Sequence, residues 1–331
     1  MNQRLIDTPS GQRIQIVEDG DPAGPLVLLL HGFPETSRSW RHQLPALAAA
    51  GCHAVAPDLR GYGGSGAPET VEDYRMLSLV ADNVALVEAL GAASAIVIGH
   101  DWGSPIAAAS ALLRPDLFTA VGLLSVPYTP PGGPRPTSVF AQMPGPEQFY
   151  VAYFQQPGVA EAEIEADPRE WVRGFAAALA GGADAPAPGD DAAPSGPVFT
   201  IPPGGRMRDR FPAGAAADRA LAGWLPDTEL DALAASLTEH GATPALNRYR
   251  NMDRDWEDLA AWRGQPLRQP SLWLVGERDA SAVWLADAIA AYPQTLPGLR
   301  GAHTLAGAGH WLQQERPAEV NALLTDWLRS L

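Results

Sequence analysis

The strongest constraint on the fold is a repeated alternation of short, fully apolar runs with segments of helical spacing. Leu26 to Leu30 is an unbroken apolar run that leads into a Gly/Pro turn, and Ala54 to Ala56 and Ala95 to Gly99 repeat the pattern. Helical spacing appears over Asp82 to Leu90 and Ile106 to Leu113. Unbroken apolar runs predict strands buried on both faces, and helices between such strands predict right-handed crossovers. We therefore expect an α/β fold with a mostly parallel sheet flanked by helices.

The sheet pattern is interrupted in the middle of the chain. A further strand is expected over Val121 to Val126, after which Pro, Gly and Ala dominate, and strand character returns only at Ser271 to Val275. An insertion of this kind predicts one α/β core formed by residues 1–130 and 246–331, with a helical lid, or cap, over residues 131–245.

Within this insertion, helices are expected over Gln148 to Ala166 and Asp227 to His240, with the acidic residues of 160–170 on a solvated helix face. Residues 181–206 are rich in Gly, Ala, Pro and Asp, which predicts a long mobile loop. After the insertion, a strand over Ala302 to Leu305 and a helix over Ala318 to Leu328 close the core.

Charge and composition exclude several kinds of function. The 38 acidic and 23 basic side chains give a net charge of −15, and the chain contains no lysine. Lysine-dependent P-loop and Schiff-base chemistry is therefore excluded. An acidic chain repels nucleic acid and anionic membranes. No run approaches the roughly 18 apolar residues of a membrane helix, and Met1 to Ile16 lacks a signal-like apolar segment. We expect a cytoplasmic protein.

Metal and disulfide chemistry are also not expected. Cys52 is the single cysteine, so no internal disulfide can form, and it is interpreted as a core residue. The histidines His42, His53, His240 and His303 show no metal-ligand spacing with each other or with Cys52. No metal or other cofactor is predicted.

The chemistry is concentrated in Gly99-His100-Asp101-Trp102-Gly103, between a predicted strand and a predicted helix. This arrangement is typical of a nucleophile elbow, in which small residues two places on either side let the strand and helix approach. The central residue is Asp101 where a serine would be expected. A carboxylate with an ordinary pKa of about 3.9 is ionised at neutral pH and suits attack at a saturated carbon. We predict an alkyl ester on Asp101.

Hydrolysis of that ester needs a general base. His310, in Gly309-His310-Trp311 after the last strand, is predicted to activate water. Asp279, after the preceding strand, is predicted to orient the imidazole, although an aspartate at this place often caps a helix instead. The chain order of nucleophile, acid and histidine is the one that α/β-hydrolase folds use.

The turn His31-Gly32-Phe33-Pro34 follows the first long apolar strand. The backbone N–H groups of Phe33 and Trp102 are predicted to form an oxyanion hole for the tetrahedral intermediate. A cis peptide is expected at Phe33-Pro34, because only proline makes that isomer accessible. His31 and His100 flank the site and are interpreted as structural residues, held by neighbouring backbone.

These motifs resemble the α/β-hydrolase superfamily, and their details are similar to its soluble epoxide hydrolase branch. The resemblance covers nearly the whole chain, including HGFPETSRSW, DLRGYGGSG, GHDWGS, the lid segment FYVAYFQQPG and the later segment NRYRNM. In that branch two lid tyrosines face the nucleophile, which implies Tyr150 and Tyr249 here. Tyr150 is preferred over Tyr153 because it stands four residues before the phenylalanine of the FQ pair, as in the family pattern.

The tyrosine pair also has a physical reason. Opening an epoxide produces an alkoxide, which leaves slowly unless an acid protonates it, and a neutral phenol can do so at pH 7. The resemblance implies a cofactor-independent epoxide hydrolase that acts on an epoxide and water, with Trp102, Phe33 and Phe154 lining the substrate site. Whether the protein forms a homodimer stays open.

Two other functions stay open. A haloalkane dehalogenase would use the same nucleophile, but that branch often has an Asn where this chain has Phe33, and haloacetate-type enzymes need arginines that Trp102 to Ala109 lacks. A ligand-binding relative without turnover is the second alternative. An esterase is disfavoured because no serine occupies the elbow, and Ser104 lies beyond it.

Overall fold

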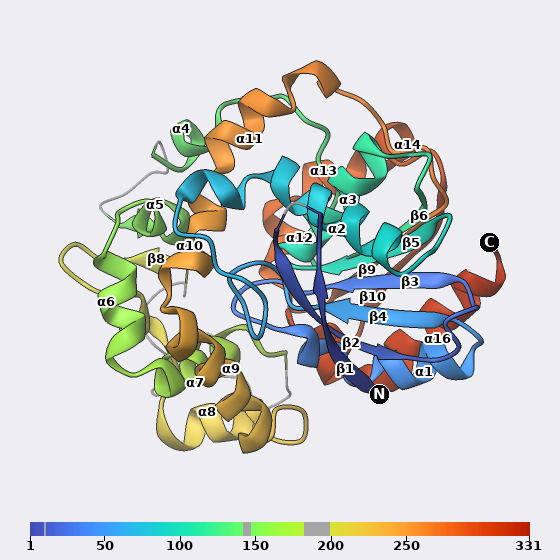
Figure 1. The fold of residues 1–331 in the computed structure, drawn as a ribbon. Coiled ribbons are helices and arrows are strands. Elements are labelled where there is room, and N and C mark those ends of the chain that lie inside the picture. Colours follow the sequence, from blue (N-terminus) through green and yellow to red (C-terminus); the bar gives the residue numbers. More distant parts are fainter. Residues whose placement is uncertain (10, 142–146, 182–198) are drawn as a thin grey trace.

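The computed structural model describes residues 1–9, 11–141, 147–181 and 199–331. Within them, one sheet runs in the order β1-β2-β4-β3-β5-β6-β9-β10 (Figure 1). Its strands are β1 (Asn2–Asp7), β2 (Arg13–Asp19), β3 (Leu26–Leu30), β4 (His53–Pro57), β5 (Ala95–His100), β6 (Phe118–Leu124), β9 (Ser271–Gly276) and β10 (Leu299–Leu305). The pairs β1–β2 and β2–β4 are antiparallel and all other neighbours are parallel, which confirms the predicted fold class.

The strand predictions are confirmed, with two differences. The antiparallel strands β1 and β2 were not predicted, although Ile14 and Ile16 are buried in alternation with more exposed neighbours, as a half-buried strand requires. The strand expected over Val121 to Val126 ends at Leu124, because Ser125 turns the chain with a φ of +69°.

The alternating side chains of β3 explain the layers of the core. Leu28 and Leu30 pack into one apolar cluster, together with helices α2 (Met76–Ala89) and α3 (Gly103–Leu113). Val27 and Leu29 point to the opposite face and pack with α1 (Gln43–Ala49) and α16 (Pro317–Arg329). Both faces of β3 are therefore covered, as its unbroken apolar run predicts.

The segment between β6 and β9 is mainly helical, and much of it forms the group of helices to the left of the sheet in Figure 1. Its elements are α4 (Pro136–Ala141), β7 (Gln148–Phe149), α5 (Tyr150–Phe154), α6 (Val159–Ala166), α7 (Pro168–Leu179), β8 (Thr200–Ile201), a 3-10 helix (Met207–Arg210), α8 (Gly214–Leu221), α9 (Asp227–His240), α10 (Thr243–Arg250), α11 (Met252–Asp258) and a second 3-10 helix (Ala260–Trp262). We refer to the elements from α4 to α10 as the cap. The exact limits 131–245 stay a prediction.

Of the two helices expected in the cap, one is confirmed and the other is divided. The helix over Asp227 to His240 is confirmed as α9. The stretch Gln148 to Ala166 is not one helix: it starts with β7, and α5 and α6 are separated at Gly158, whose φ of +82° breaks helical geometry.

The loop expected over residues 181–206 falls mostly on residues 182–198, which lie outside the described residues. In the described remainder, Thr200–Ile201 form β8, which pairs antiparallel with β7. The expectation of a loop is therefore wrong at these two residues.

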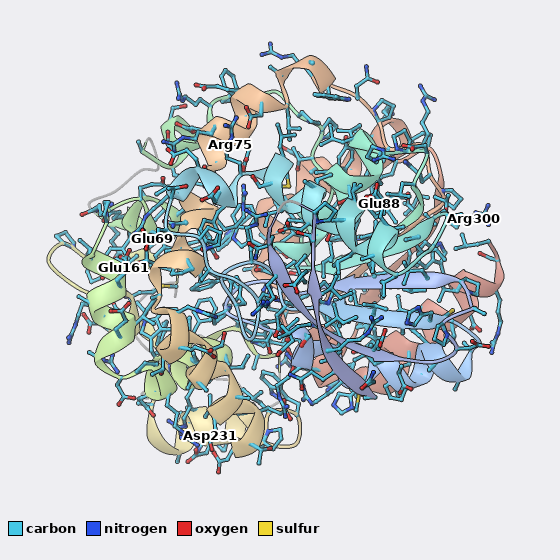
Figure 2. The ribbon with its side chains drawn as sticks, viewed as in Figure 1. Glu69, Arg75, Glu88, Glu161, Asp231 and Arg300 are labelled. Atoms are coloured by element: carbon cyan, nitrogen blue, oxygen red, sulfur yellow. The ribbon has the colours of Figure 1, made fainter. Side chains whose placement is uncertain are left out.

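The interpretation of residues 160–170 as a solvated helix face is also wrong in part. Figure 2 shows Glu161 on the cap and Glu88 on the core, and the two carboxylates differ in environment. Glu88 is exposed, whereas Glu161 is buried, accepts a hydrogen bond from the Gly158 N–H at 2.9 Å and pairs with Arg250 at 2.7 Å. Glu163 is buried as well. These acids start and anchor α6 rather than face solvent.

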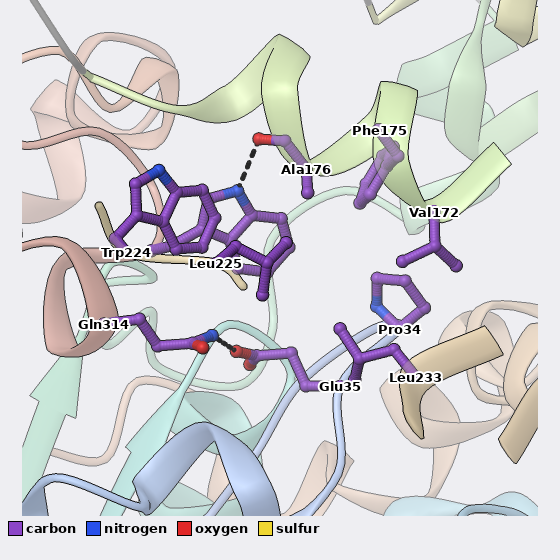
Figure 3. A pocket seen from close by; sticks show the side chains of 10 residues that line it. Pro34, Glu35, Val172, Phe175, Ala176, Trp224, Leu225, Leu233 and Gln314 are labelled. Atoms are coloured by element: carbon purple, nitrogen blue, oxygen red, sulfur yellow. Dashed lines mark hydrogen bonds between the residues drawn. The ribbon is translucent and has the colours of Figure 1, made fainter. Parts of the chain in front are cut away.

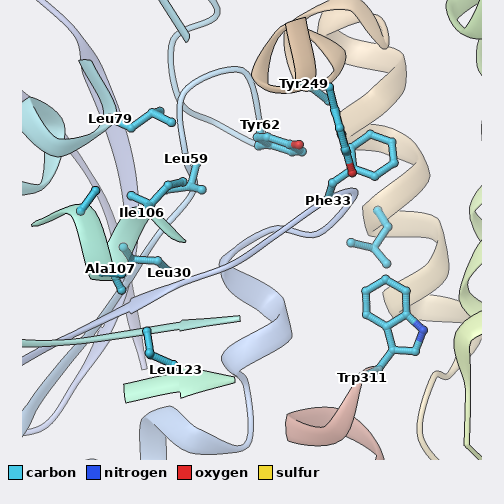
Figure 4. Packing of buried hydrophobic residues seen from close by; sticks show 14 of the residues in the cluster. Leu30, Phe33, Leu59, Tyr62, Leu79, Ile106, Ala107, Leu123, Tyr249 and Trp311 are labelled. Carbon is cyan, nitrogen blue, oxygen red and sulfur yellow. The ribbon is translucent and has the colours of Figure 1, made fainter. Parts of the chain in front are cut away.

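The cap packs over the turn that follows β3. The ring of Phe33 contacts Phe154, Trp171, Phe175 and Tyr249 of the cap, at centroid distances between 5.4 and 6.0 Å. This aromatic packing is continuous with the core cluster around β3 (Figure 4). The carboxyl edge of the parallel strands is therefore enclosed by apolar side chains, as a water-excluding site requires.

Candidate active site

The turn between β5 and α3 has the geometry of a nucleophile elbow. Asp101 has a φ of +49°, in the left-handed region that non-glycine residues rarely occupy. A Cβ atom at Gly99 would overlap the carbonyl group of Gly103, and one at Gly103 would overlap the carbonyl of Leu30. Glycine is therefore required at both positions, and the tight turn presents Asp101 at the carboxyl edge of the sheet.

The turn after β3 holds the Asp101 carboxylate. The backbone N–H of Phe33 donates a hydrogen bond to Oδ1 of Asp101 at 2.8 Å, and a side chain at Gly32 would overlap Asp101. The Phe33-Pro34 peptide is cis, as expected. The N–H of Trp102, proposed from the sequence as the second oxyanion donor, belongs to the residue directly after the nucleophile, and its role stays a prediction.

His310 lies between two carboxylates. Its Nε2 is 3.5 Å from Oδ2 of Asp101, and its Nδ1 is 3.3 Å from Oδ2 of Asp279. Burial alone would lower the pKa of His310, but the two carboxylates, Asp279 above all, raise it well above its usual value. The structure thus brings together all three residues that the sequence predicts for nucleophile, base and acid.

Asp279 combines the two interpretations that the sequence left open. It is the N-cap of α12 (Ala280–Trp284), because its Oδ1 accepts the N–H of Ser281 at 3.0 Å. Its other oxygen, Oδ2, faces His310. Burial acts to raise the pKa of Asp279, but His310 and the hydrogen bonds to the carboxylate outweigh burial and lower it to about 2. The carboxylate is therefore charged and fixed in orientation.

Tyr249 and Tyr150, the two phenols that the resemblance implies, lie on the cap and pack next to each other beside the turns that carry Trp102 and Phe33. The Tyr249 ring lies edge-on to Trp102 at 5.1 Å and to Phe33 at 5.4 Å, and Figure 4 shows Phe33 and Tyr249 side by side. The Tyr150 ring lies 6.0 Å from that of Tyr249. Burial, followed by the effect of nearby groups including Asp101, raises the pKa of both phenols. Both are neutral proton donors at pH 7.

The structure also separates Tyr150 from Tyr153. The Tyr153 hydroxyl donates to Glu163 at 2.7 Å, and Trp171 donates to the same carboxylate at 2.8 Å. Tyr153 is thus engaged in a buried hydrogen-bond cluster of the cap. Among the described residues, none forms a hydrogen bond with the Tyr150 hydroxyl, which leaves Tyr150 as the phenol available to a substrate.

Phe154 and the two structural histidines also lie close to the site. Phe154 is fully buried, and its ring is 5.0 Å from Tyr249. His31 accepts a hydrogen bond from the Leu59 N–H and contacts the Gly32 carbonyl, in agreement with a structural role. His100 is held only in part by backbone, since one ring nitrogen contacts the carbonyl of His310 at 2.8 Å.

The other ring nitrogen of His100 contacts a residue that the sequence did not single out. Nδ1 of His100 lies 2.7 Å from Oε2 of Glu35, a buried carboxylate just after the Phe33-Pro34 turn. The other oxygen of Glu35 accepts hydrogen bonds from Gln313 and Gln314. Burial acts to raise the pKa of Glu35, but His100 outweighs it and the pKa is lowered to about 2. This network links the oxyanion turn to the His310 loop.

A second missed residue is Ser125, at the end of β6. Its hydroxyl donates to Oδ2 of Asp279 at 2.6 Å and lies 2.9 Å from Nδ1 of His310. The sequence offered one signal, its position directly after a parallel strand that ends at the same edge as Asp101. A serine at such a position belongs to no recognisable motif, so no further local signal identifies it.

Two cavities flank the turn that carries Phe33. One lies between the cap and the loops of the core and is lined by Glu35, Gln314, Phe175 and Trp224 among others (Figure 3). The other is lined by Gly32, Tyr62, Trp102 and Arg248 among others.

Two further features of the described residues bear on function. None of their helices combines the length and apolar character that a membrane span needs. No group of three or more His, Cys, Asp or Glu side chains among them has the arrangement of a metal site.

Comparison with known proteins agrees with this geometry. The model of the alpha/beta hydrolase fold family matches residues 25–317. Epoxide hydrolase A of Mycobacterium tuberculosis is 42% identical over 99% of this chain and 98% of its own length, and epoxide hydrolase B of the same organism is 37% identical over 97% and 96%.

Solved structures are similar over the full length. An epoxide hydrolase from an endophytic Streptomyces is 60% identical, with a TM-score of 0.93 over 99% of this chain and 95% of that one. Epoxide hydrolase A from Mycobacterium thermoresistibile is 42% identical, with a TM-score of 0.89 over 100% and 98%. The chain therefore belongs to the α/β-hydrolase fold family and, within it, to the epoxide hydrolases.

Proposed function

We propose that this enzyme converts an epoxide and water into a vicinal diol in two steps, through a covalent alkyl ester on Asp101. The observation that supports the proposal is that Asp101 lies 3.5 Å from His310, while Tyr249 packs against the neighbouring Trp102 and Tyr150 packs against Tyr249. A carboxylate at an elbow supplies the nucleophile, the phenols supply protons to the departing oxygen, and the histidine supplies the base for hydrolysis.

In the first step, Asp101 attacks one ring carbon of the epoxide. Oδ1 is held by the N–H of Phe33, and the attacking atom is Oδ2, which faces Nε2 of His310 at 3.5 Å. The carbon–oxygen bond of the ring breaks as the ester bond forms. Tyr150 and Tyr249 donate hydrogen bonds to the ring oxygen, and one of them transfers its proton to the alkoxide. The tyrosinate is reprotonated before the next turnover.

In the second step, Nε2 of His310 removes a proton from water, and the resulting hydroxide attacks the ester carbonyl. The oxyanion of the tetrahedral intermediate is stabilised by the N–H groups of Phe33 and Trp102. Loss of one such donor typically costs about 3 kcal/mol of barrier. The ester bond then breaks, the alkoxide of the diol takes the proton from His310, and Asp101 is left as a carboxyl. Loss of that proton and uptake of one proton by the tyrosinate restore the carboxylate and the phenol. Asp279 stabilises the imidazolium between these transfers.

The phenol pair favours an epoxide over a haloalkane. A halide leaves as a stable anion without a proton, whereas the alkoxide from an epoxide is a strong base that needs one. Two neutral phenols beside the nucleophile meet that need. A ligand-binding relative would have no use for a charged nucleophile, a base and two acids in contact, so catalysis is the better account.

The proposal also covers partners and location. We infer that the enzyme works in the cytoplasm, and the net charge of −15 supports the view that neither nucleic acid nor anionic membrane is a partner. The oligomeric state is tested by light scattering coupled to size exclusion, which separates a monomer of 35.0 kDa from a homodimer.

The experiment is a substrate panel of terminal, styrene-like and internal fatty epoxides together with chloroalkanes and bromoalkanes. Wild type is compared with Asp101→Asn, and Asp116→Asn is the matched control, because Asp116 is an exposed acid outside the site. We expect diol formation by wild type and the control, none by Asp101→Asn, and no halide release. Undiminished epoxide turnover by Asp101→Ala, or preferred halide release, would contradict the proposal.

A further inference from the structure

Ser125 places a hydroxyl group between the two residues proposed to drive ester hydrolysis. Its Oγ is 2.6 Å from Oδ2 of Asp279 and 2.9 Å from Nδ1 of His310, whereas the direct distance from that nitrogen to Asp279 is 3.3 Å. The nearest hydrogen-bond partner of Nδ1 in this cluster is therefore the serine and not the aspartate. Ser125 is itself fully buried.

The direction of each hydrogen bond follows from which groups carry a proton to donate. The carboxylate of Asp279 can only accept, so the short contact of 2.6 Å requires the Ser125 hydroxyl to donate to it. The lone pairs of the hydroxyl oxygen are then free to accept the N–H of Nδ1. His310 thus keeps a proton on Nδ1 in both of its states, and Nε2 is the atom that gains and loses one.

The backbone of Ser125 is held as well. Ser281, one residue into α12, donates from its Oγ to the backbone carbonyl of Ser125 at 2.7 Å. Its N–H holds Oδ1 of Asp279 at 3.0 Å. The start of α12 thus locks Ser125 and Asp279 in one orientation.

We propose that Ser125 is a positioning residue for ester hydrolysis: its hydroxyl bridges Asp279 and His310 and thereby fixes the imidazole tautomer whose free Nε2 faces the ester. The proposal rests on the two-step function above and adds a residue to its second step. Asp101 attacks the epoxide without a base, so the first step does not depend on the bridge.

The conformation of Ser125 allows a backbone effect to be separated from the hydroxyl. Its φ of +69° is unfavourable for any side chain but is readily adopted by glycine. Ser125→Gly removes the hydroxyl and relieves the backbone, whereas Ser125→Ala removes the hydroxyl and keeps the strain. If the hydroxyl itself is needed, ester hydrolysis should be slowed equally in both variants. A purely structural role predicts that the glycine variant equals wild type.

The bridge also has an expected effect on pH dependence. The charged and titratable groups facing His310 are Asp101, which is neutral once it carries the ester, Asp279, and His100 backed by Glu35. The hydrogen bond from Ser125 disperses the charge of Asp279. Without this hydrogen bond the full negative charge of Asp279 acts on the imidazolium and raises the pKa of His310. Ester hydrolysis should therefore begin to slow at a higher pH than in wild type.

The test is single-turnover kinetics with enzyme in excess over styrene oxide, quenched at intervals and followed by protein mass. The matched control is Ser110→Ala, which removes another buried, hydrogen-bonded hydroxyl that lies outside the site. We expect alkylation within about twofold of wild type in all variants. We expect hydrolysis to be slowed about tenfold in both Ser125 variants, the size of one lost hydrogen bond to a charged group, and unchanged in the control.

Each outcome decides one claim. Slower ester hydrolysis in both Ser125 variants, with the acid limb of the pH–rate profile moved to higher pH, supports the proposed bridge between Asp279 and His310. Wild-type hydrolysis in Ser125→Gly overturns it, whatever the alanine variant does, because glycine accepts this backbone conformation and folds. Absence of a covalent ester in the wild type itself overturns the proposed two-step function instead.

Discussion

The backbone N–H of Phe33 donates to Oδ1 of Asp101 at 2.8 Å, and this bond joins two turns that are 68 residues apart in the chain. One turn follows β3 and the other follows β5, and these strands are neighbours in the sheet. The donor is therefore in place before any substrate binds. Such preorganised donors act on a developing charge without reorganisation at the moment of reaction.

The first prediction concerns the base. In His310→Gln, Asp101 still attacks the epoxide, but no group activates water, so the ester accumulates. Intact-protein mass spectrometry should show a species heavier by one substrate mass. The double variant with Asp101→Ala should not gain that mass, and a mass gain in the double variant would place the ester elsewhere.

The second prediction concerns the two phenols. Tyr150→Phe and Tyr249→Phe should each slow ring opening by about 100-fold, the usual contribution of a positioned acid, with less effect on ester hydrolysis. Rapid-quench measurement of ester formation checks this. Tyr153→Phe is the matched control, since its hydroxyl is bonded to Glu163 in the cap. Equal losses in all three variants would show that the effect comes from the packing of the cap.

The sequence predicted the parts of the site that depend on local pattern. The elbow at Asp101 and the turn at Phe33 each follow an apolar strand, the loop at His310 follows the last strand, and all three carry a recognisable motif. Because parallel strands end at one edge of the sheet, their convergence follows from the fold class. Tyr150 and Tyr249 came from the family resemblance and not from any periodicity of the cap.

What the sequence did not predict depends on long-range packing. Ser125 bridges to Asp279 only because β6 stops at Leu124 and α12 starts beside it, 154 residues further along the chain. Glu35 pairs with His100 across 65 residues and with Gln314 across 279. No local pattern encodes such distances. The cap helices α7 and α8 were not predicted, although α7 is a 12-residue amphipathic helix that buries Trp171 and Phe175.

The third prediction concerns the buried pair of Glu35 and His100. Glu35→Gln removes a buried carboxylate that contacts the His100 ring and accepts two further side-chain hydrogen bonds, and it should lower the free energy of unfolding by about 3 kcal/mol, the upper size of a lost hydrogen bond to a charged group. Urea denaturation at pH 7 measures the loss. Glu88→Gln, a change on the exposed face of α2, should stay within about 0.5 kcal/mol of wild type. An equal loss in both variants would contradict the pairing.

The fourth prediction is a pH dependence of stability. The pKa of His310 is raised in the folded state, so the native protein binds a proton that the unfolded chain loses above its ordinary pKa of about 6.5. This contribution is complete below that pH and is lost as the pH rises through the folded pKa. The difference in unfolding free energy between wild type and His310→Gln should therefore shrink from pH 6.5 upward. A difference that grows with pH would contradict the placement of the imidazole between two carboxylates.

The central claim is that the oxygen added to the substrate comes first from Asp101. A single turnover in water enriched in oxygen-18, with enzyme in excess over epoxide, tests it directly by mass spectrometry of the diol and of the peptide that contains Asp101. The account predicts unlabelled diol and one heavy oxygen in the carboxylate of Asp101. Heavy oxygen in the diol of that first turnover, with an unlabelled peptide, would contradict it.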